Sequence, residues 1–540
     1  MKKLLSLVLL ASALSSGATE INGIAYKLNY DGSEATVIAL DGKKYTGEIT
    51  IPETVTIDGK EVTVTEIGED AFLSCDGVTA VNLPSSISLI SDFAFKDCSS
   101  LKKLEMPESL YMIGGYAFSG CTSMKSVTFN TEIRSISDYA FQDCTGLERV
   151  DISDIDAWFE ISFSNSDANP VSKAHDLYLN GSKVTEIEIP DMVWEGSSYA
   201  LTGSSVEKIT VGEDVYEIGW YAFSECENLK EIVFNCSLDA LDYGVFYGCK
   251  SLATITLPSE ITRIGDYVFQ GCTSLKSIKI PEAVTSLGFM AFAESGLESI
   301  SLSKNVTEIG SELFKDCTQL KSAVFSPDTR ITELPAYIFA GCSSLASFDI
   351  PAKTTRIDDS AFAGCSALTA IAIPSTMSII EVSAFTECTG LNRVDITDLD
   401  AWCGILFDGG GANPLTLAGN LYLNNELVTD LKVPESVKSL SSYVFQGATC
   451  LKTVSLPTTL TAIPQYAFAG CTSLESVELP YSVSQVSGYA FEGDEALTAV
   501  KISDMPSWCN IEFENPEANP LFYAHSLVLN GTVLEKLELP

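Results

Sequence analysis

A period of 23 residues constrains this chain more than any other feature of its 540-residue sequence. A small or apolar residue followed by Phe recurs at that spacing, and a Cys commonly stands three residues after the Phe. A unit this short cannot bury its apolar side alone, whereas stacked units can, so the period predicts a solenoid. The repeated Phe occupies positions Phe72, Phe95, Phe118, Phe141, Phe223, Phe246, Phe269, Phe292, Phe314, Phe339, Phe362, Phe385, Phe445, Phe468 and Phe491.

The unit that starts at Leu275, LKSIKIPEAVTSLGFMAFAESG, shows the pattern of one coil. Its first part, L-x-x-I-x-I, alternates between apolar and other residues and ends at Pro, which predicts a short strand. The V-x-x-I-G part predicts a second extended piece on the far side of the coil. The A-F-x-x-C part predicts a tight helical or 3₁₀ corner whose Phe points inward.

These units resemble leucine-rich repeats of the BspA-like (treponemal-type) bacterial class. The resemblance is carried by IPEAVTSLGFMAF, LPSEITRIGDYVFQGC and IPAKTTRIDDSAFAGC and extends over roughly residues 46 to 540. It implies a leucine-rich repeat solenoid, a β-rich, right-handed, curved stack with parallel strands along one face. Known members are exported surface proteins linked to adhesion, host-protein binding and bacterial aggregation, and the resemblance implies a role of this kind here.

Two 60-residue gaps, from Phe141 to Leu201 (which takes the Phe place once) and from Phe385 to Phe445, hold a longer repeat of 37 residues, which recurs at the end of the chain. These long coils span residues 147–183, 391–427 and 497–533 and share a Trp, an Asn-Pro pair and several Leu. Their reactive-looking residues do not recur, since Cys403 corresponds to Phe159 and His175 to Gly419. A nucleophile without a base at a fixed position cannot be activated, so no catalytic residue is predicted.

An Asp that precedes the Trp does recur in all three long coils, as Asp154, Asp398 and Asp504. We interpret these carboxylates as turn or cap groups that bond local N–H groups, with ligand contact as the alternative. The Trp, Phe and Leu side chains are expected to fill the interior of the wider coil.

Twelve of the 16 cysteines stand at one place in the repeat, three residues after the Phe. They are Cys75, Cys98, Cys121, Cys144, Cys226, Cys249, Cys272, Cys317, Cys342, Cys365, Cys388 and Cys471. A residue at one point of every coil forms a column, so these cysteines are predicted to be buried free thiols, with systematic disulfides as the alternative. No C-x-x-C and only two His occur, so neither a metal nor a cofactor is predicted.

The ends of the chain depart from the repeat. Met1–Ala18 has two lysines, an apolar run and small residues, which predicts a signal peptide and a secreted or cell-surface protein. Residues 19–50 predict an N-terminal β-hairpin cap, because Asp-Gly pairs interrupt short strand-like runs. Residues 51–540 then form the solenoid. Its C-terminal end is expected to be uncapped, as a fragment or as an exposed edge strand.

Charge excludes some partners. The chain has 72 acidic and 32 basic residues, a net charge of −40, which argues against nucleic acid and against anionic lipid surfaces. No apolar stretch is long enough to span a bilayer. The outward positions of the predicted strands are nevertheless near neutral. Their basic residues form a candidate protein-binding face, namely Lys102, Lys103, Lys125, Arg149, Lys230, Lys276, Lys279, Lys321, Arg393 and Lys452.

A mixed-charge face suits many small polar contacts with a protein ligand, such as a host matrix or bacterial surface protein. The alternative interpretation of the same charges is pairing between neighbouring strands. The leading hypothesis is therefore a non-enzymatic exported protein that mediates adhesion. A glycan-binding module would need clustered, solvent-facing aromatic side chains, which the outward strand positions of the regular coils lack. A structural protein that self-assembles at the surface is the third hypothesis, and the sequence leaves the oligomeric state open.

Overall fold

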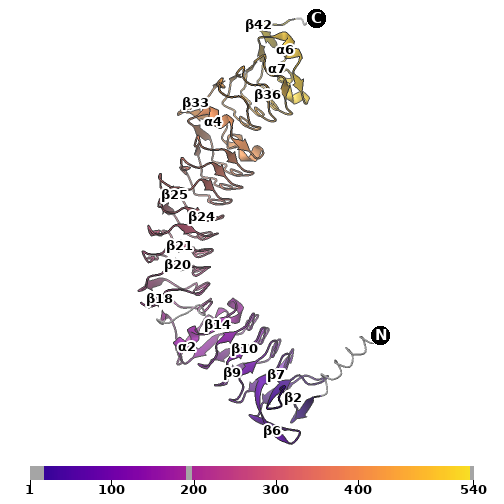
Figure 1. Cartoon of the computed structure of the whole chain (residues 1–540), viewed down its shortest axis with the longest axis vertical. Helices are drawn as coiled ribbons and strands as arrows, with labels where there is room; N and C mark the ends of the chain where they lie inside the picture. Colours follow the sequence, from indigo (N-terminus) through magenta and orange to yellow (C-terminus); the bar gives the residue numbers. More distant parts are fainter. Residues whose placement is uncertain (1–16, 190–197, 536–540) are drawn as a thin grey trace, which may run out of the picture. The chain divides into compact units, whose positions relative to one another are not determined.

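The structure, a computed structural model, describes residues 17–189 and 198–535. It is a β-solenoid of about 20 stacked turns, most of them about 23 residues apart, which confirms the predicted fold class. The chain divides into two compact units, residues 1–261 and 262–540. Within each unit the coils stack one on the next (Figure 1). Of the predicted signal peptide, 1–18, all but Gly17 and Ala18 lies outside the described residues.

In the N-terminal unit, the L-x-x-I-x-I segments form the strands that we call the strand face. Leu104 aligns with Val127, and Val127 with Val150, so neighbouring parallel strands are offset by one 23-residue period. All three side chains are buried, while the residues beside them face outward. The strands are β4 (Thr46–Thr50), β7 (Gly77–Asn82), β9 (Lys103–Glu105), β11 (Ser126–Thr128), β13 (Arg149–Ile152), β15 (Leu177–Leu179), β17 (Glu186–Ile189), β18 (Lys208–Val211) and β19 (Glu231–Phe234).

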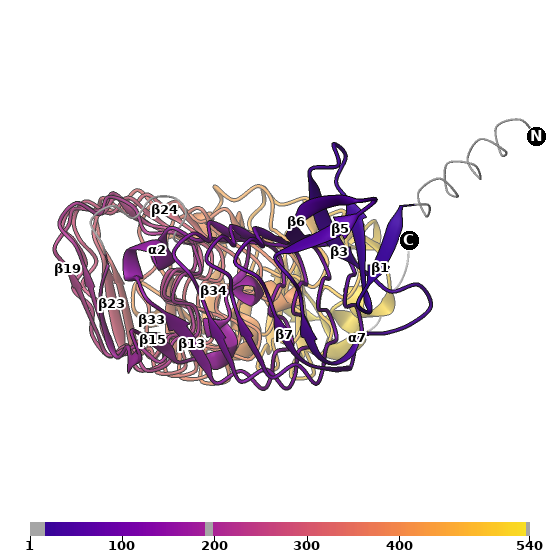
Figure 2. The same ribbon diagram turned by 90° about the horizontal axis from the view of Figure 1, so that it is seen from below.

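The V-x-x-I-G segments form the second extended piece on the far side, as predicted. In Figure 2, β7 and β13 lie on one side of the unit and β6 on the other. Ile90, Ile113 and Ile136 are buried and pair in parallel from coil to coil. The strands of this second face are β6 (Lys60–Ile67), β8 (Leu89–Ile90), β10 (Met112–Ile113), β12 (Ser135–Ile136), β14 (Ser162–Phe163) and β20 (Ala240–Leu241).

The residues before the first coil form more than a hairpin. Three antiparallel strands follow one another, and the third pairs in parallel with β6 of the second face. The ring of Tyr45 packs 4.6 Å from that of Phe72, the first Phe of the repeat. The strands are β1 (Ala18–Ile21), β2 (Ile24–Leu28) and β3 (Glu34–Ile38); a separate hairpin strand, β5 (Thr54–Ile57), pairs with β6.

The C-terminal unit repeats this arrangement with the same parallel register. Its strand face comprises β23 (Ser299–Leu302), β25 (Ser322–Phe325), β28 (Ala370–Ile373), β30 (Arg393–Ile396), β32 (Leu421–Leu423), β34 (Asp430–Lys432), β35 (Thr453–Ser455), β37 (Ser476–Leu479), β39 (Ala499–Ile502) and β41 (Leu527–Leu529). Its second face comprises β21 (Arg263–Ile264), β22 (Ser286–Leu287), β24 (Glu308–Ile309), β26 (Glu333–Leu334), β27 (Arg356–Ile357), β29 (Ile379–Ile380), β31 (Leu406–Phe407), β36 (Ala462–Ile463), β38 (Gln485–Val486) and β40 (Glu512–Phe513).

The predicted helical corner is wrong for the regular coils, whose described corners are tight turns. Two residues with positive φ flank each corner Phe, for example Tyr116 (55°) and Gly120 (76°) around Phe118. Left-handed residues at both places prevent a helix from continuing. Every second corner N–H group bonds the next coil, as from the Phe95 N–H to the Ala117 carbonyl (2.7 Å), and those between bond the carbonyl three residues before, as from Lys96 to Phe93. The corners therefore help to hold successive coils together.

The corner Phe and Cys side chains form the core columns. Phe362 and Phe385 stack with their rings 5.4 Å apart, and both are fully buried. Nine of the column thiols donate to the carbonyl of the corner Phe in the preceding coil, as from Cys98 Sγ to Phe72 O (3.1 Å), and Cys226 donates to Leu201, which takes the Phe place. All 16 cysteines are free, and the twelve column cysteines are buried, which confirms the predicted free thiols. Burial raises the pKa of the Cys98 thiol to about 12.

This burial predicts the reactivity of the thiols. Cys509 is exposed, whereas the column cysteines are both buried and, where their pKa is raised, poor thiolates. In the native protein, we expect Cys509 to react first with Ellman's reagent, ahead of the half-buried Cys236 and Cys450, whose pKa burial raises, and all 16 thiols to react after denaturation without reductant. A count well below 16 in the denatured protein would show that disulfides form in the column.

Candidate functional site

The ten predicted basic residues lie in the L-x-x-I-x-I segments, in or directly before a strand of the strand face except for Lys276 and Lys279, whose segment is extended but forms no assigned strand. The eight lysines are exposed, whereas Arg149 and Arg393 are half-buried. Seven of the ten form ion pairs with carboxylates of the same face. The pairs are Lys103–Glu105, Lys125–Glu148, Arg149–Asp151, Lys230–Glu207, Lys276–Glu298, Lys321–Glu298 and Arg393–Asp395.

Several of these pairs join neighbouring coils at the period of the repeat. Lys230 Nζ lies 2.8 Å from Glu207, and Lys321 Nζ lies 3.0 Å from Glu298. Glu298 also lies 3.6 Å from Lys276 of the preceding coil, and the Lys321 and Lys276 ammonium groups lower the pKa of its carboxyl. Exposed ion pairs contribute little stability each, so these charges favour one strand register more than they strengthen the stack.

The two arginines each contact an aromatic ring as well as a carboxylate. Arg149 donates from Nε and Nη2 to both carboxylate oxygens of Asp151, and its guanidinium lies 3.8 Å from the ring centre of Tyr178. Arg393 makes the same contacts with Asp395 and with Tyr422, the latter at 4.0 Å. Both groups belong to long coils, where they join the first strand of the coil to the strand that follows.

Three predicted residues have no ion-pair partner within residues 17–189 and 198–535. They are Lys102, Lys279 and Lys452, and all three are exposed. Lys102 lies directly before β9, Lys279 follows the buried Ile278, and Lys452 lies directly before β35. Their ammonium groups can bind the carboxylate of a partner without first breaking an ion pair within the chain.

Each predicted 37-residue coil consists of two parts. Val150 aligns with Leu177, so the strand register advances by 27 residues through the first part. The chain then turns back at Asn180 and Gly181, both with positive φ, and forms a short antiparallel hairpin. Ten residues after Leu177, Ile187 lies in β17 and starts a new sheet. The hairpin therefore interrupts the strand face after the first and second long coils, where β17 and β34 start new sheets.

The hairpin strands are β16 (Ser182–Lys183), β33 (Glu426–Leu427) and β42 (Thr532–Val533). The short helices of the long coils are α2 (Ile155–Phe159), η1 (Ser166–Ala168), α3 (Val171–Ala174), α4 (Leu399–Cys403), η3 (Gly410–Ala412), α5 (Leu415–Ala418), α6 (Met505–Cys509), η4 (Pro516–Ala518) and α7 (Leu521–Ala524). Asp154, Asp398 and Asp504 accept hydrogen bonds from the first N–H groups of α2, α4 and α6, which confirms the cap interpretation.

The shared Trp and Asn of the long coils bind the coil that follows. Asn413 is fully buried, and its Nδ2 donates to the carbonyls of Tyr443 (2.6 Å) and Val444 (3.2 Å). Trp402 Nε1 donates to the same Val444 carbonyl at 3.1 Å. Asn169 and Trp158 make the equivalent bonds to the next coil in the N-terminal unit. These residues therefore have a structural role that their recurrence in the sequence reflects.

One column position departs from the pattern in an informative way. Asp494 takes the place of the column Cys, and its side chain is fully buried. Oδ1 accepts a hydrogen bond from the Cys471 N–H (2.8 Å), whereas Oδ2 has no partner among the described residues. Burial raises the pKa of the Asp494 carboxyl from 3.8 to about 9. The side chain is therefore a neutral acid at pH 7.

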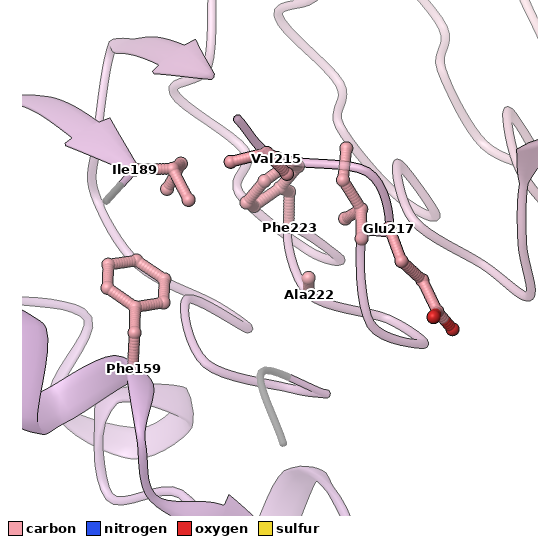
Figure 3. A pocket seen from close by; sticks show the side chains of 7 residues that line it. Phe159, Ile189, Val215, Glu217, Ala222 and Phe223 are labelled. Atoms are coloured by element: carbon pink, nitrogen blue, oxygen red, sulfur yellow. The ribbon is translucent and has the colours of Figure 1, made fainter. Parts of the chain in front are cut away.

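An apolar pocket lies beside the first long coil but lacks the features of a ligand site. Its cavity volume is only about 10 Å³, and it is lined by Phe159, Ile189, Val215, Glu217, Ile218, Ala222 and Phe223. The carboxylate of Glu217 points away from the apolar side chains (Figure 3). A binding site needs polar groups that converge on the ligand, and this lining offers none. Ile189 is also the last described residue before 190–197.

The described residues contain no group of three or more His, Cys, Asp or Glu side chains that could hold a metal ion. Over residues 17–189 and 198–535, no helix has the length and apolar character needed to cross a membrane. The candidate site is therefore the strand face, with the long coils as its interruptions.

The structure is that of a leucine-rich repeat protein: it has short parallel strands, buried columns of Leu, Ile and Phe, and a 23-residue period. The family model for the BspA type leucine rich repeat region matches six copies, at residues 47–169, 174–276, 195–321, 239–368, 290–401 and 416–515. The chain belongs to this family, as the resemblance of its repeats predicts.

Two solved structures illustrate the likeness. A leucine-rich cell surface protein of Faecalibacterium prausnitzii is 28% identical, covering 72% of this chain and 98% of its own, with a TM-score of 0.45. A leucine-rich repeat protein of Bacteroides ovatus is 24% identical, covering 92% of this chain and 99% of its own, with a TM-score of 0.38. Among curated proteins, none matches the sequence.

Proposed function

We propose that this chain is a non-enzymatic exported protein that binds other proteins through its strand face, as an adhesin at a bacterial surface. The observation that carries the proposal is the composition of that face. The whole chain has a net charge of −40, yet basic side chains are exposed on the strand face beside acidic ones. A mixed-charge surface of this kind provides many polar contacts and selects its partner by charge complementarity.

Two further points support the proposal. Proteins of this repeat family present a long, solvent-facing row of strands, which suits an extended contact with a macromolecule. The N-terminal sequence Met1–Ala18 has the pattern of a signal peptide, which agrees with export. The partner is a host matrix protein or a bacterial surface protein with acidic groups that face the strand-face lysines.

The lysines without internal partners provide the test. A triple variant, Lys102→Glu, Lys279→Glu and Lys452→Glu, is expected to weaken binding to the best ligand from a panel of purified host matrix and bacterial surface proteins by about tenfold or more. Its binding should also lose most of its dependence on salt, because the charged contacts are gone. Surface plasmon resonance at two ionic strengths measures both effects.

A matched control changes the net charge equally at exposed lysines outside the L-x-x-I-x-I segments, as Lys43→Glu, Lys304→Glu and Lys438→Glu. This control should bind as the unmodified protein does. Equal loss in both triple variants would assign the effect to net charge rather than to the strand face. Absence of protein binding at micromolar concentrations would contradict the proposed adhesion.

A further inference from the structure

One strand of the strand face in the C-terminal unit lacks a neighbour on one side. β35 pairs with β34 on one side and with β37 on the other, whereas β34 pairs only with β35 and starts a new sheet. The hairpin strand β33, which runs antiparallel to β32, ends the preceding sheet at this place. Among the described residues, β34 therefore has one edge paired with the next coil and one edge without a strand beside it.

The hydrogen bonds before the strand show the same interruption. In the regular coils that follow, the Lys452 N–H bonds the Thr429 carbonyl (2.7 Å), and the Glu475 N–H bonds the Lys452 carbonyl (2.8 Å). The Thr429 N–H makes no such bond to a preceding coil within residues 17–189 and 198–535. The Val428 N–H before it bonds the Leu421 carbonyl of the long coil (2.9 Å). The hairpin therefore separates β34 from the strand that would otherwise pair with it.

The backbone groups on the free edge of β34 follow from its ladder with β35. On the β35 side, the Thr429 carbonyl accepts a hydrogen bond, and the Val433 N–H donates one to the Ser455 carbonyl (3.0 Å). Successive residues of a strand direct their N–H and C=O groups to opposite edges, so those of Asp430 and Lys432 point away from β35. Neither residue has a backbone hydrogen bond to another described residue.

The side chains along this edge leave it exposed. Asp430 and Lys432 are exposed, and Leu431 between them is buried in the core. Leu427 of the adjacent hairpin is 43% exposed, and Asn425 at the hairpin tip is exposed as well. A strand edge with unpaired N–H and C=O groups is a template for a further strand.

We propose that the free edge of β34 binds an extended segment of a partner protein by strand addition. The inference rests on the proposed protein-binding function and assigns to it a site and a mode of binding. A strand fits this edge because an extended backbone presents C=O and N–H groups at the spacing of Asp430 and Lys432. Opposite charges pair across neighbouring strands, as Lys208 and Glu231 do between β18 and β19 (3.0 Å). The partner segment therefore carries an acidic side chain opposite Lys432.

Proline at position 432 tests the proposal, because it removes the N–H on the free edge and leaves the bonds to β35 in place. Lys432→Pro is expected to lower the affinity for the tightest-binding protein of the matrix and surface-protein panel by about tenfold or more. Lys432→Ala keeps the N–H and should lower this affinity by at most about threefold. Surface plasmon resonance measures both variants. Equal affinities of Lys432→Pro and Lys432→Ala would overturn the inference.

The stability of the variants checks that the edge is free in the unbound chain. Lys432→Pro should unfold at the same urea concentration as the unmodified chain. Val433→Pro is the matched comparison, because it removes the N–H that bonds the Ser455 carbonyl, and it should unfold at a lower urea concentration. Equal destabilisation by the two prolines would overturn the inference, since it would show that position 432 is already paired.

Hydrogen exchange locates the bound segment. In the free chain, peptides covering residues 429–433 should exchange faster than those covering β37, which is paired on both sides. The panel protein should slow exchange at 429–433. Binding without this protection overturns the inference and leaves the proposed function standing, whereas absence of binding by the whole panel overturns both. Protection of 429–433 in the chain alone at high concentration would also overturn it, since the occupant would then be a second copy.

Discussion

Replacing Asp494 by Cys is expected to stabilise the C-terminal coils and to remove a pH dependence of the unmodified chain. The carboxyl is fully buried, and its Oδ2 lacks a partner among the described residues. A thiol at this position would restore the column, whose Cys471 donates to the Phe445 carbonyl at 3.3 Å. A buried thiol also costs much less to desolvate than a carboxyl group.

The sign of the pH effect follows from the direction of the pKa shift. Burial raises the pKa of Asp494 from 3.8 to about 9, so the folded chain holds a proton that the unfolded chain releases above pH 3.8. The free energy of unfolding therefore falls as the pH rises between these two values, by at most about 1.4 kcal/mol per pH unit. The contribution of the protonated Asp494 carboxyl to the free energy of unfolding is therefore largest in acid and is lost towards pH 9.

Urea unfolding followed by circular dichroism at pH 5 and pH 8 measures this effect. The unmodified chain should lose stability between the two pH values by more than Asp494→Cys does. Glu495→Gln removes a neighbouring carboxylate that is exposed, and it should behave as the unmodified chain does. Equal pH dependence in the unmodified chain and Asp494→Cys would show that the buried carboxyl is already ionised or rehydrated.

Replacing Asn413 by Ala is expected to separate the second long coil from the coil that follows it. The change removes two hydrogen bonds to the carbonyls of Tyr443 and Val444 and one from the Leu415 N–H. Buried groups left without partners cost about 1–3 kcal/mol each, so we expect a loss of about 3 kcal/mol or more in the free energy of unfolding. Urea unfolding of the C-terminal unit, followed by hydrogen exchange of its peptides, measures the loss.

The first long coil supplies a second test within the same chain. Asn169 Nδ2 donates to the carbonyls of Tyr199 (2.7 Å) and Ala200 (3.0 Å), and Asn169 Oδ1 accepts from the Val171 N–H (2.9 Å). Asn169→Ala should therefore destabilise the N-terminal unit about as much as Asn413→Ala destabilises the C-terminal unit. A negligible cost of both substitutions would contradict the structural role of this Asn.

The candidate site was only partly accessible to sequence reasoning. The alternation of L-x-x-I-x-I placed the ten basic residues on one face, because side chains of a strand point to opposite sides in turn. Which of them are paired depends on distances between coils. Lys321 reaches Glu298, whereas Lys279, two coils before Lys321 in the same unit, has no ion-pair partner among the described residues. Whether a lysine forms an ion pair depends on its side-chain rotamer and on which residue the next coil places opposite it. The repeat pattern describes only what the coils share, so it does not contain this information.

The sequence by itself determined the solenoid, the length of its coils, the buried Phe and Cys columns and the capping role of Asp154, Asp398 and Asp504. These features follow from periodicity, because a residue at the same place in every coil meets the same neighbours. The tertiary structure alone decided the left-handed residues of the corners, since Tyr116 at a φ of 55° contradicts its local preference and is held by bonds to adjacent coils. It also decided the division of each long coil into a 27-residue turn and a hairpin, because strand pairing, and not the sequence interval, sets the register.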